Sequence, residues 1–310
     1  MFNNLLGVMV IYIYNQTYGS SYITSLISKY EAITADAMGL SVFSSLVTTI
    51  KTLAICITML LYFMDLFGKV TEKNFSIEQF FKATLRCVTT YIFISNSIEI
   101  VGYLMDAGSS LSSSIASYGG YNFFTTNHKV MFINSFNSFS IAEILSYIMN
   151  CLIPWLLSMI GSVVIQIVLI SRVLEIVVLT VFAPLAIADI YREGTSSSGV
   201  QYMKRMLALG LQVAVILVIN AATQAIILEV IGGNSGLTMS KLLKEVTEFT
   251  GSRHEAIKNG TLIYTKESVE DFMSAICNQN DLVKVLGIQL ARLGLIWNSL
   301  PLCEEITGAK

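Results

Sequence analysis

The stretch ILSYIMNCLIPWLLSMIGSVVIQIVLIS, residues 144–171, contains 28 residues without a charged side chain. At about 1.5 Å of rise per residue, a helix of this length exceeds the roughly 30 Å hydrocarbon thickness of a bilayer. Backbone polar groups in lipid must pair within their own segment, which favours a helix over a strand. The stretch therefore predicts a transmembrane helix.

Apolar segments of this kind dominate the chain. Of its 310 residues, 54% are hydrophobic and 13% are charged, whereas soluble domains carry about 25% charged residues. A surface with so few charges must be covered partly by lipid. The other apolar segments are residues 43–67, 87–105, 173–188, 206–230 and the charge-interrupted 282–300. The sequence thus predicts an all-α fold, a polytopic transmembrane helical bundle of about five to six membrane segments.

Polar stretches between these segments predict the topology. Residues 68–86 and 191–205 are rich in Lys and Arg, and short basic loops stay in the cytoplasm. Residues 106–143 are rich in Ser, Gly and Asn and hold one basic residue, Lys129. We therefore expect 68–86 and 191–205 inside the cell and 106–143 outside it.

The chain divides into six parts on this basis. We expect an N-terminal interfacial or extracytoplasmic segment, two transmembrane helices, an extracytoplasmic Ser/Gly-rich loop, core transmembrane helices, a soluble amphipathic segment, and an interfacial or last transmembrane helix with a tail. Their respective boundaries are 1–42, 43–105, 106–143, 144–231, 232–281 and 282–310.

The segment around Pro184 poses a problem of counting. Two full crossings between residues 144 and 188 would place the basic stretch 191–205 outside the cell. Proline removes a backbone donor and clashes with the preceding helical turn. We therefore expect residues 173–189 to form a broken element, re-entrant or interfacial, near a lumen or a subunit contact.

Charged residues within apolar segments are the main candidates for a functional role, because each is costly in a membrane. Arg172 and Glu175 are three positions apart, so they are expected to share a helix face and to pair. Glu99 is expected to reach the membrane interface or to face the bundle interior. A self-neutralising ion pair at the membrane edge is the simpler interpretation of Arg172 and Glu175, and a subunit-contact site is the sharper one.

Catalytic and cofactor motifs are missing from the sequence. The chain has no G-x-x-x-x-G-K-[ST] phosphate-binding loop, no H-E-x-x-H and no C-x-x-C pattern. Its net charge of −2 gives no global field that would hold nucleic acid tightly. We expect no enzyme activity, no metal and no cofactor.

The sequence from Ser171 to Leu211 resembles the TrbL-type polytopic component of conjugative and type IV secretion systems. The matching pattern is an Arg and a Glu that open a helix, an Ala-Pro-x-x-x-Ala stop, a polar turn, and a basic Tyr-x-Lys entry into the next helix. The matching positions are Arg172, Glu175, Ala183, Pro184, Ala188, Tyr202, Lys204 and Arg205.

This resemblance implies a homo-oligomeric inner-membrane ring at the base of a translocation channel. Such a subunit would contact membrane lipid, other secretion-system subunits and a transient DNA or protein substrate, with energy from partner ATPases. The alternative is a small-solute transporter or permease whose transport depends on Glu99, Glu175 or Arg172. A scaffold without a lumen is a third possibility.

Overall fold

The computed structural model describes residues 2–18, 21–38, 41–71, 76–119, 126–193, 197–235, 263–276 and 279–309. Within these ranges the regular elements are twelve α-helices and one short 3-10 helix, without a strand. The predicted all-α class is therefore confirmed. Three helices are long and apolar enough to cross a membrane, and the number rises to 5 if each of two bent helix pairs counts as one span. The chain is a multi-pass membrane protein.

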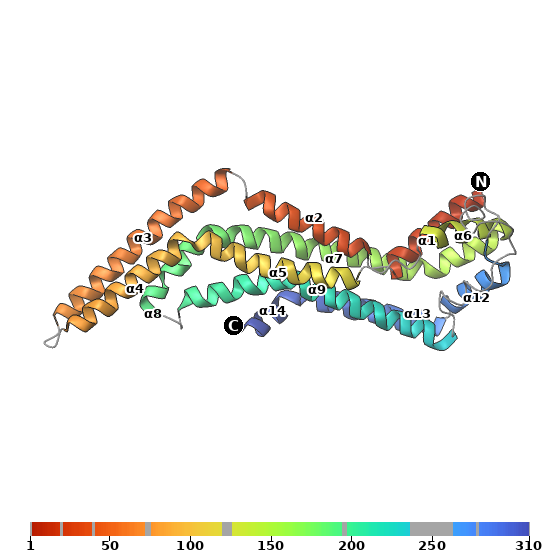
Figure 1. Ribbon diagram of the computed structural model, residues 1–310. Helices are drawn as coiled ribbons and strands as arrows, with labels where there is room; N and C mark the ends of the chain where they lie inside the picture. The colour runs from red at the N-terminus through yellow and green to blue at the C-terminus, as the bar shows by residue number, and fades with distance from the viewer. Residues whose placement is uncertain are drawn as a thin grey trace. The chain divides into compact units, whose positions relative to one another are not determined.

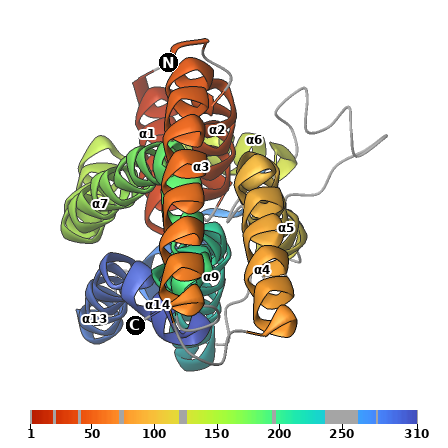
Figure 2. The same ribbon diagram turned by 90° about the vertical axis from the view of Figure 1, so that its left-hand side faces the viewer.

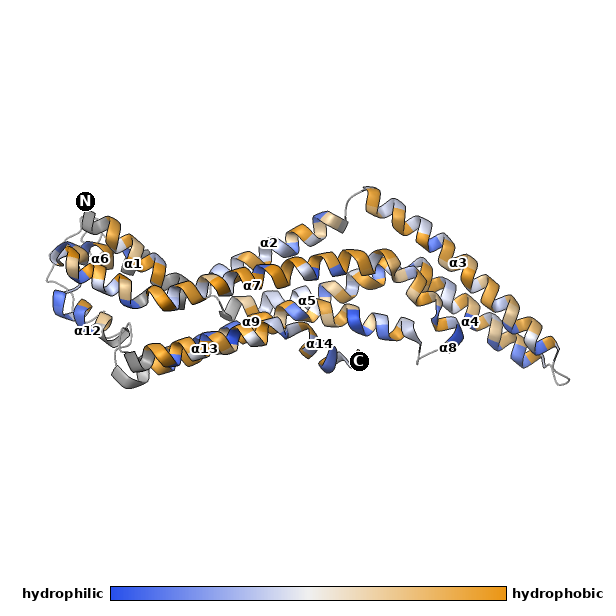
Figure 3. Cartoon of the chain, turned by 180° about the vertical axis from the view of Figure 1, so that it is seen from behind, coloured by the Kyte–Doolittle hydropathy of each residue, from blue (hydrophilic) through white to orange (hydrophobic). Residues whose placement is uncertain are grey.

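The candidate spans are carried by few, long helices, which are coloured hydrophobic along much of their length in Figure 3. The unbroken spans are α3 (Ser41–Val70), Leu152–Arg192, which begins within α7 (Ile141–Ala188), and Ser198–Ile227 in α9 (Ser198–Ser235). The bent pairs are α4 (Ile77–Ser95) with α5 (Ser97–Gly119), and α13 (Gln279–Trp297) with α14 (Ser299–Thr307).

The helices belong to two compact units. Unit 1 contains Met1–Ser25, Ala116–Gln166 and Leu217–Trp297, and unit 2 contains Leu26–Ile115, Ile167–Ile216 and Asn298–Lys310. α7 and α9 each contribute one part to each unit.

Unit 1 is built on an aromatic core. α1 (Phe2–Tyr18) packs on α6 (Thr126–Ser135) and on the short helix η1 (Phe136–Ser138) that follows it (Figure 1). The Phe132 ring meets the rings of Phe136 and of Phe272 edge to face, at centroid distances of 5.1 and 5.8 Å. Phe272 belongs to α12 (Lys266–Ile276), so this core fixes α12 against α6.

Unit 2 contains the hairpin of α3 and α4, which lie side by side (Figure 1). The Tyr62 hydroxyl and the Thr84 hydroxyl are 3.0 Å apart across this hairpin. α8 (Ile190–Glu193) packs against both helices, where the Tyr191 hydroxyl donates to the Asp65 carboxylate at 3.1 Å. α2 (Ser21–Met38) contributes most of its length to the same unit.

The structure corrects the expectation of a broken element at residues 173–189. α7 continues through Pro184 and ends at Ala188, so the third and fourth apolar segments form a single helix of 48 residues. Ala183 and Pro184 are buried, and Ala183 belongs to a cluster with Ile176 and Leu209. Packing by neighbouring helices is what lets a membrane helix tolerate proline.

The Ser/Gly-rich stretch 106–143 is also not a loop in its described part. α5 runs on to Gly119, and α6, η1 and the start of α7 follow from residue 126. The hydroxyls of Ser112 and Ser114 donate to the carbonyls of Gly108 and Ser110, four residues earlier. Serines that bond back in this way do not compete with the helix.

The second apolar segment, 87–105, is interrupted at Asn96, where α4 meets α5 at 62° (Figures 1 and 2). The Lys51 ammonium of α3 donates to the Ser95 carbonyl at this bend. A carbonyl left free by the end of α4 thus gains a charged donor.

The polar segment 232–281 is described only in part. Its amphipathic stretch near 240–249 and its Asn259-Gly260 turn lie outside the described residues. The helix expected to start at Ser268 begins earlier, at Lys266, because the Thr265 hydroxyl accepts from the Ser268 amide at 3.4 Å.

Candidate functional site

Polar side chains from α7, α9 and α14 meet in unit 2. The Arg205 Nε of α9 donates to the Glu175 carboxylate of α7 at 3.0 Å. The Glu304 carboxylate of α14 lies 3.7 Å from the same Nε. One guanidinium thus joins three helices.

Glu175 therefore pairs with Arg205, and not with Arg172 as the sequence spacing predicted. Arg172 is 6% exposed and its Nε donates to the Leu209 carbonyl of α9 at 2.8 Å. The correct partner was 30 positions away in the chain. Helix periodicity reports only neighbours three or four residues apart.

The remaining residues of the TrbL-type pattern lie along the same helix pair. The Tyr202 hydroxyl donates to the Leu179 carbonyl at 2.9 Å, which ties α9 to α7. The Lys204 ammonium donates to the Gly308 carbonyl at 3.2 Å, just after the end of α14. Pro184 is buried in α7. Tyr202 and Lys204 thus connect α9 to α7 and to the residue that follows α14.

Glu99 does not join this group. It lies exposed in the first turn of α5. A carboxylate is favoured there because backbone N–H groups at a helix start carry partial positive charge. It does not face the interior of unit 2, which was one of the two expectations.

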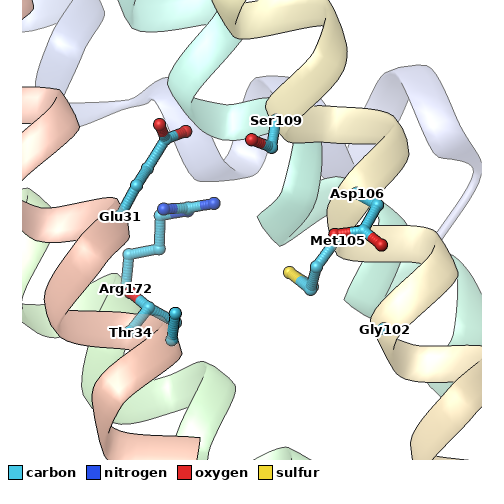
Figure 4. Close-up of a pocket in the computed structure, with 8 residues that line it drawn as sticks. Glu31, Thr34, Gly102, Met105, Asp106, Ser109 and Arg172 are labelled. Carbon is cyan, nitrogen blue, oxygen red and sulfur yellow. The ribbon is translucent and has the colours of Figure 1, made fainter.

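A cavity of about 200 Å³ opens between the parts of α2, α5 and α7 that belong to unit 2. Its lining residues are Glu31, Thr34, Ala35, Gly102, Met105, Asp106, Ser109 and Arg172. Figure 4 shows the Arg172 guanidinium reaching from α7 into the space between α2 and α5, with Glu31 on one side and Ser109 and Asp106 across from it.

The electrostatics of this cavity combine one cation with two carboxylates. Burial raises the pKa of Glu31 above its ordinary value, and the positive charge of Arg172 offsets part of that rise. The Oε1 atom of Glu31 is buried without a hydrogen-bond partner. Sequence reasoning identified Arg172 but missed Glu31 and Asp106, because both are in stretches that contain many other polar residues.

A second set of polar contacts lies where α3 meets α8. Asp65 accepts from the Tyr191 hydroxyl and pairs with Lys69 at 2.7 Å. The basic stretches 68–86 and 191–205 therefore adjoin each other in unit 2. The expectation that both lie on one side of the membrane remains a prediction.

Among the described residues, no group of three or more His, Cys, Asp or Glu side chains is placed to hold a metal ion. Comparison of the chain with protein-family models, with curated proteins and with solved structures gives no match.

Proposed function

We propose that this chain is an integral membrane subunit of a conjugative or type IV secretion apparatus, with TrbL-like architecture. It forms or supports the channel that passes DNA or protein across a bacterial inner membrane. Partner ATPases supply the energy, because the sequence carries no phosphate-binding loop of its own.

One observation carries the proposal. The polar residues that give the sequence its TrbL-type pattern make the contacts that hold α7 to α9 and α14. Arg205 with Glu175 and Glu304, and Tyr202 with the Leu179 carbonyl, account for most of them. If the pattern had arisen by chance, its polar residues would not be expected to make contacts among the same three helices.

The surface of α3 supports a role within a larger membrane assembly. Only 17% of its candidate span is buried, although α3 packs on α4 and α8. Large side chains such as Leu53, Leu60 and Phe67 are exposed along it. Lipid or neighbouring subunits must cover an apolar face of this size.

Loss of transfer in the host tests the proposal. Deletion of the gene should abolish conjugal DNA transfer or effector secretion, and the wild-type gene supplied in trans should restore it. Tagged protein extracted in mild detergent should be part of a ring of several copies, together with secretion ATPases. Unchanged transfer after deletion, or a monodisperse monomer under gentle extraction, would contradict the proposal.

The alternative function is a small-solute transporter, which the charged cavity at Arg172 favours. It predicts solute flux into proteoliposomes that contain this chain alone, and loss of that flux in Arg172→Gln. Transfer in the host would then persist without the gene.

A further inference from the structure

The cavity between α2, α5 and α7 holds a buried acceptor without a hydrogen-bond partner, and the guanidinium of a buried arginine. Within the described residues, only the Nε atom of Arg172 donates a hydrogen bond, to the Leu209 carbonyl. Its two terminal nitrogens form no hydrogen bond with the described residues. The Glu31 Oε1 atom also lacks a partner. The charge of Arg172 acts on Glu31, yet the ion pairs among the described residues do not include these two side chains.

Burying a charge without a partner costs several kcal/mol, so an arrangement of this kind calls for a group that fills the gap. A simple anion would suit Arg172 but would face the carboxylates of Glu31 and Asp106. A simple cation would suit those carboxylates but would face the guanidinium. A ligand with one charge of each sign satisfies both ends.

We propose that this cavity binds a phosphoethanolamine group, with its phosphate at the terminal nitrogens of Arg172 and its ammonium at Glu31 and Asp106. The hydroxyl of Ser109 also lines the cavity and can donate to the phosphate. The volume of about 200 Å³ is below the roughly 300–1,000 Å³ of sites for larger ligands. The cavity therefore suits a small head group.

The position of Arg172 along α7 matches a membrane source for this group. The apolar stretch Leu152–Arg192 has 41 residues, about twice the roughly 20 residues that cross the hydrocarbon. Arg172 lies at its middle. If either half of the stretch crosses the bilayer, Arg172 lies near the level of the lipid head groups. The same chemistry is also present in free phosphoethanolamine.

Binding to the delipidated full-length protein in detergent tests the proposal. The probes are dioleoyl-phosphatidylethanolamine, dioleoyl-phosphatidylglycerol and free phosphoethanolamine, followed by native mass spectrometry. We expect one phosphatidylethanolamine per chain. Phosphatidylglycerol, which lacks the ammonium, should bind about tenfold more weakly, since one charge-assisted hydrogen bond is lost.

Two pairs of variants locate the site. A Cβ atom at Gly102 would meet no atom within 4 Å, so Gly102→Leu places apolar bulk at the cavity wall and should abolish binding. Gly68→Leu is its control, because Gly68 is equally unobstructed and lies outside the cavity. Glu31→Gln should weaken binding about tenfold, and Asp36→Asn on the same helix should not.

The outcomes separate the possible sources. Binding of the lipid without competition from free phosphoethanolamine supports a membrane ligand, and competition by the free compound supports a soluble one. Equal binding of both lipids, no binding of any probe, or retained binding in Gly102→Leu would overturn the proposal. The proposal rests on the charged cavity and not on the secretion role, so transfer assays and binding assays fail independently.

Discussion

Arg205 provides the clearest test at the scale of single residues. The Arg205 guanidinium now pairs with the carboxylates of Glu175 and Glu304. Arg205→Glu would replace it with a third carboxylate. The Arg205 and Glu175 side chains are 49% and 25% exposed, so we expect a loss of only about 1 kcal/mol. Thermal unfolding in detergent measures it.

The double exchange Glu175→Arg with Arg205→Glu should recover part of this loss, because the pair is restored with its signs reversed. Lys82→Glu is the control. Its pair with Glu78 is 73% and 75% exposed, and such pairs contribute little. An equal effect of Arg205→Glu and Lys82→Glu would show that Arg205 does not stabilise the contact of α9 with α7 and α14.

Glu143 predicts a pH dependence in unit 1. Its pKa lies below the ordinary value of 4.5 because the Ser140 amide and hydroxyl, and then Lys266, hydrogen-bond to the carboxylate. A lowered pKa stabilises the folded state above the ordinary value, and this contribution is lost as the pH falls through the lowered pKa.

Wild type should therefore unfold at a higher temperature than Glu143→Gln near neutral pH, and the difference should shrink as the pH falls below 4.5 and through the lowered pKa. Glu267→Gln, on an exposed part of α12, is the control. A difference that persists in acid would contradict the assigned hydrogen bonds.

The sequence identified several important residues but not their partners. Arg172, Glu175 and Arg205 were recognisable because charges are rare in apolar segments. The contact of Glu175 with Arg205 was not, because it depends on how α7 and α9 pack. Glu31 and Asp106 carried no signal, since a carboxylate in a polar stretch is usually solvated.

Among the helices, the crossing of α5 and α9 is the tightest described approach. A Cβ atom at Gly108 would lie 2.2 Å from the Gly210 carbonyl oxygen. Gly108→Ala must push the helices apart, at a cost of about 1–3 kcal/mol. Gly102→Ala on the same helix meets nothing within 4 Å and should be neutral or slightly stabilising. Equal unfolding temperatures for the two variants would refute this crossing.

Pro184→Ala tests the continuity of α7. Alanine is favoured over proline in a helix interior by about 3 kcal/mol, and the lost ring atoms cost about 0.8 kcal/mol each. We expect a net gain of about 1 kcal/mol and intact assembly. Pro301→Ala is the control, because proline is tolerated in the first turn of α14. Impaired assembly in Pro184→Ala would instead support a broken helix at residues 173–189.

Helix existence was predictable from the sequence, whereas helix ends were not. Each long apolar segment became a helix because lipid leaves the backbone no other partner. One helix break that the sequence predicted is absent, and one that it did not predict is present. Pro184 lies within a helix because buried neighbours support it, and Asn96 ends one inside a segment that looked continuous.

For the whole molecule, the continuous α7 removes the counting problem. With 106–143 outside and 191–205 inside, as the sequence predicts, a single crossing by α7 is sufficient. Contacts of Lys204 with Gly308, and of Arg205 with Glu304, bring the chain's end beside the start of α9. If both bent pairs cross, the expected topology predicts an N-terminus outside and a C-terminus inside.

Labelling of single cysteines in a cysteine-free background, with a membrane-impermeant thiol reagent on spheroplasts, tests this membrane arrangement most directly. The sites are Ser113→Cys in α5, Gln201→Cys in α9 and Ala309→Cys, and the first two positions are exposed. We predict that intact spheroplasts label only position 113 and that lysis exposes the other two. Labelling of position 201 before lysis would contradict a single crossing by α7.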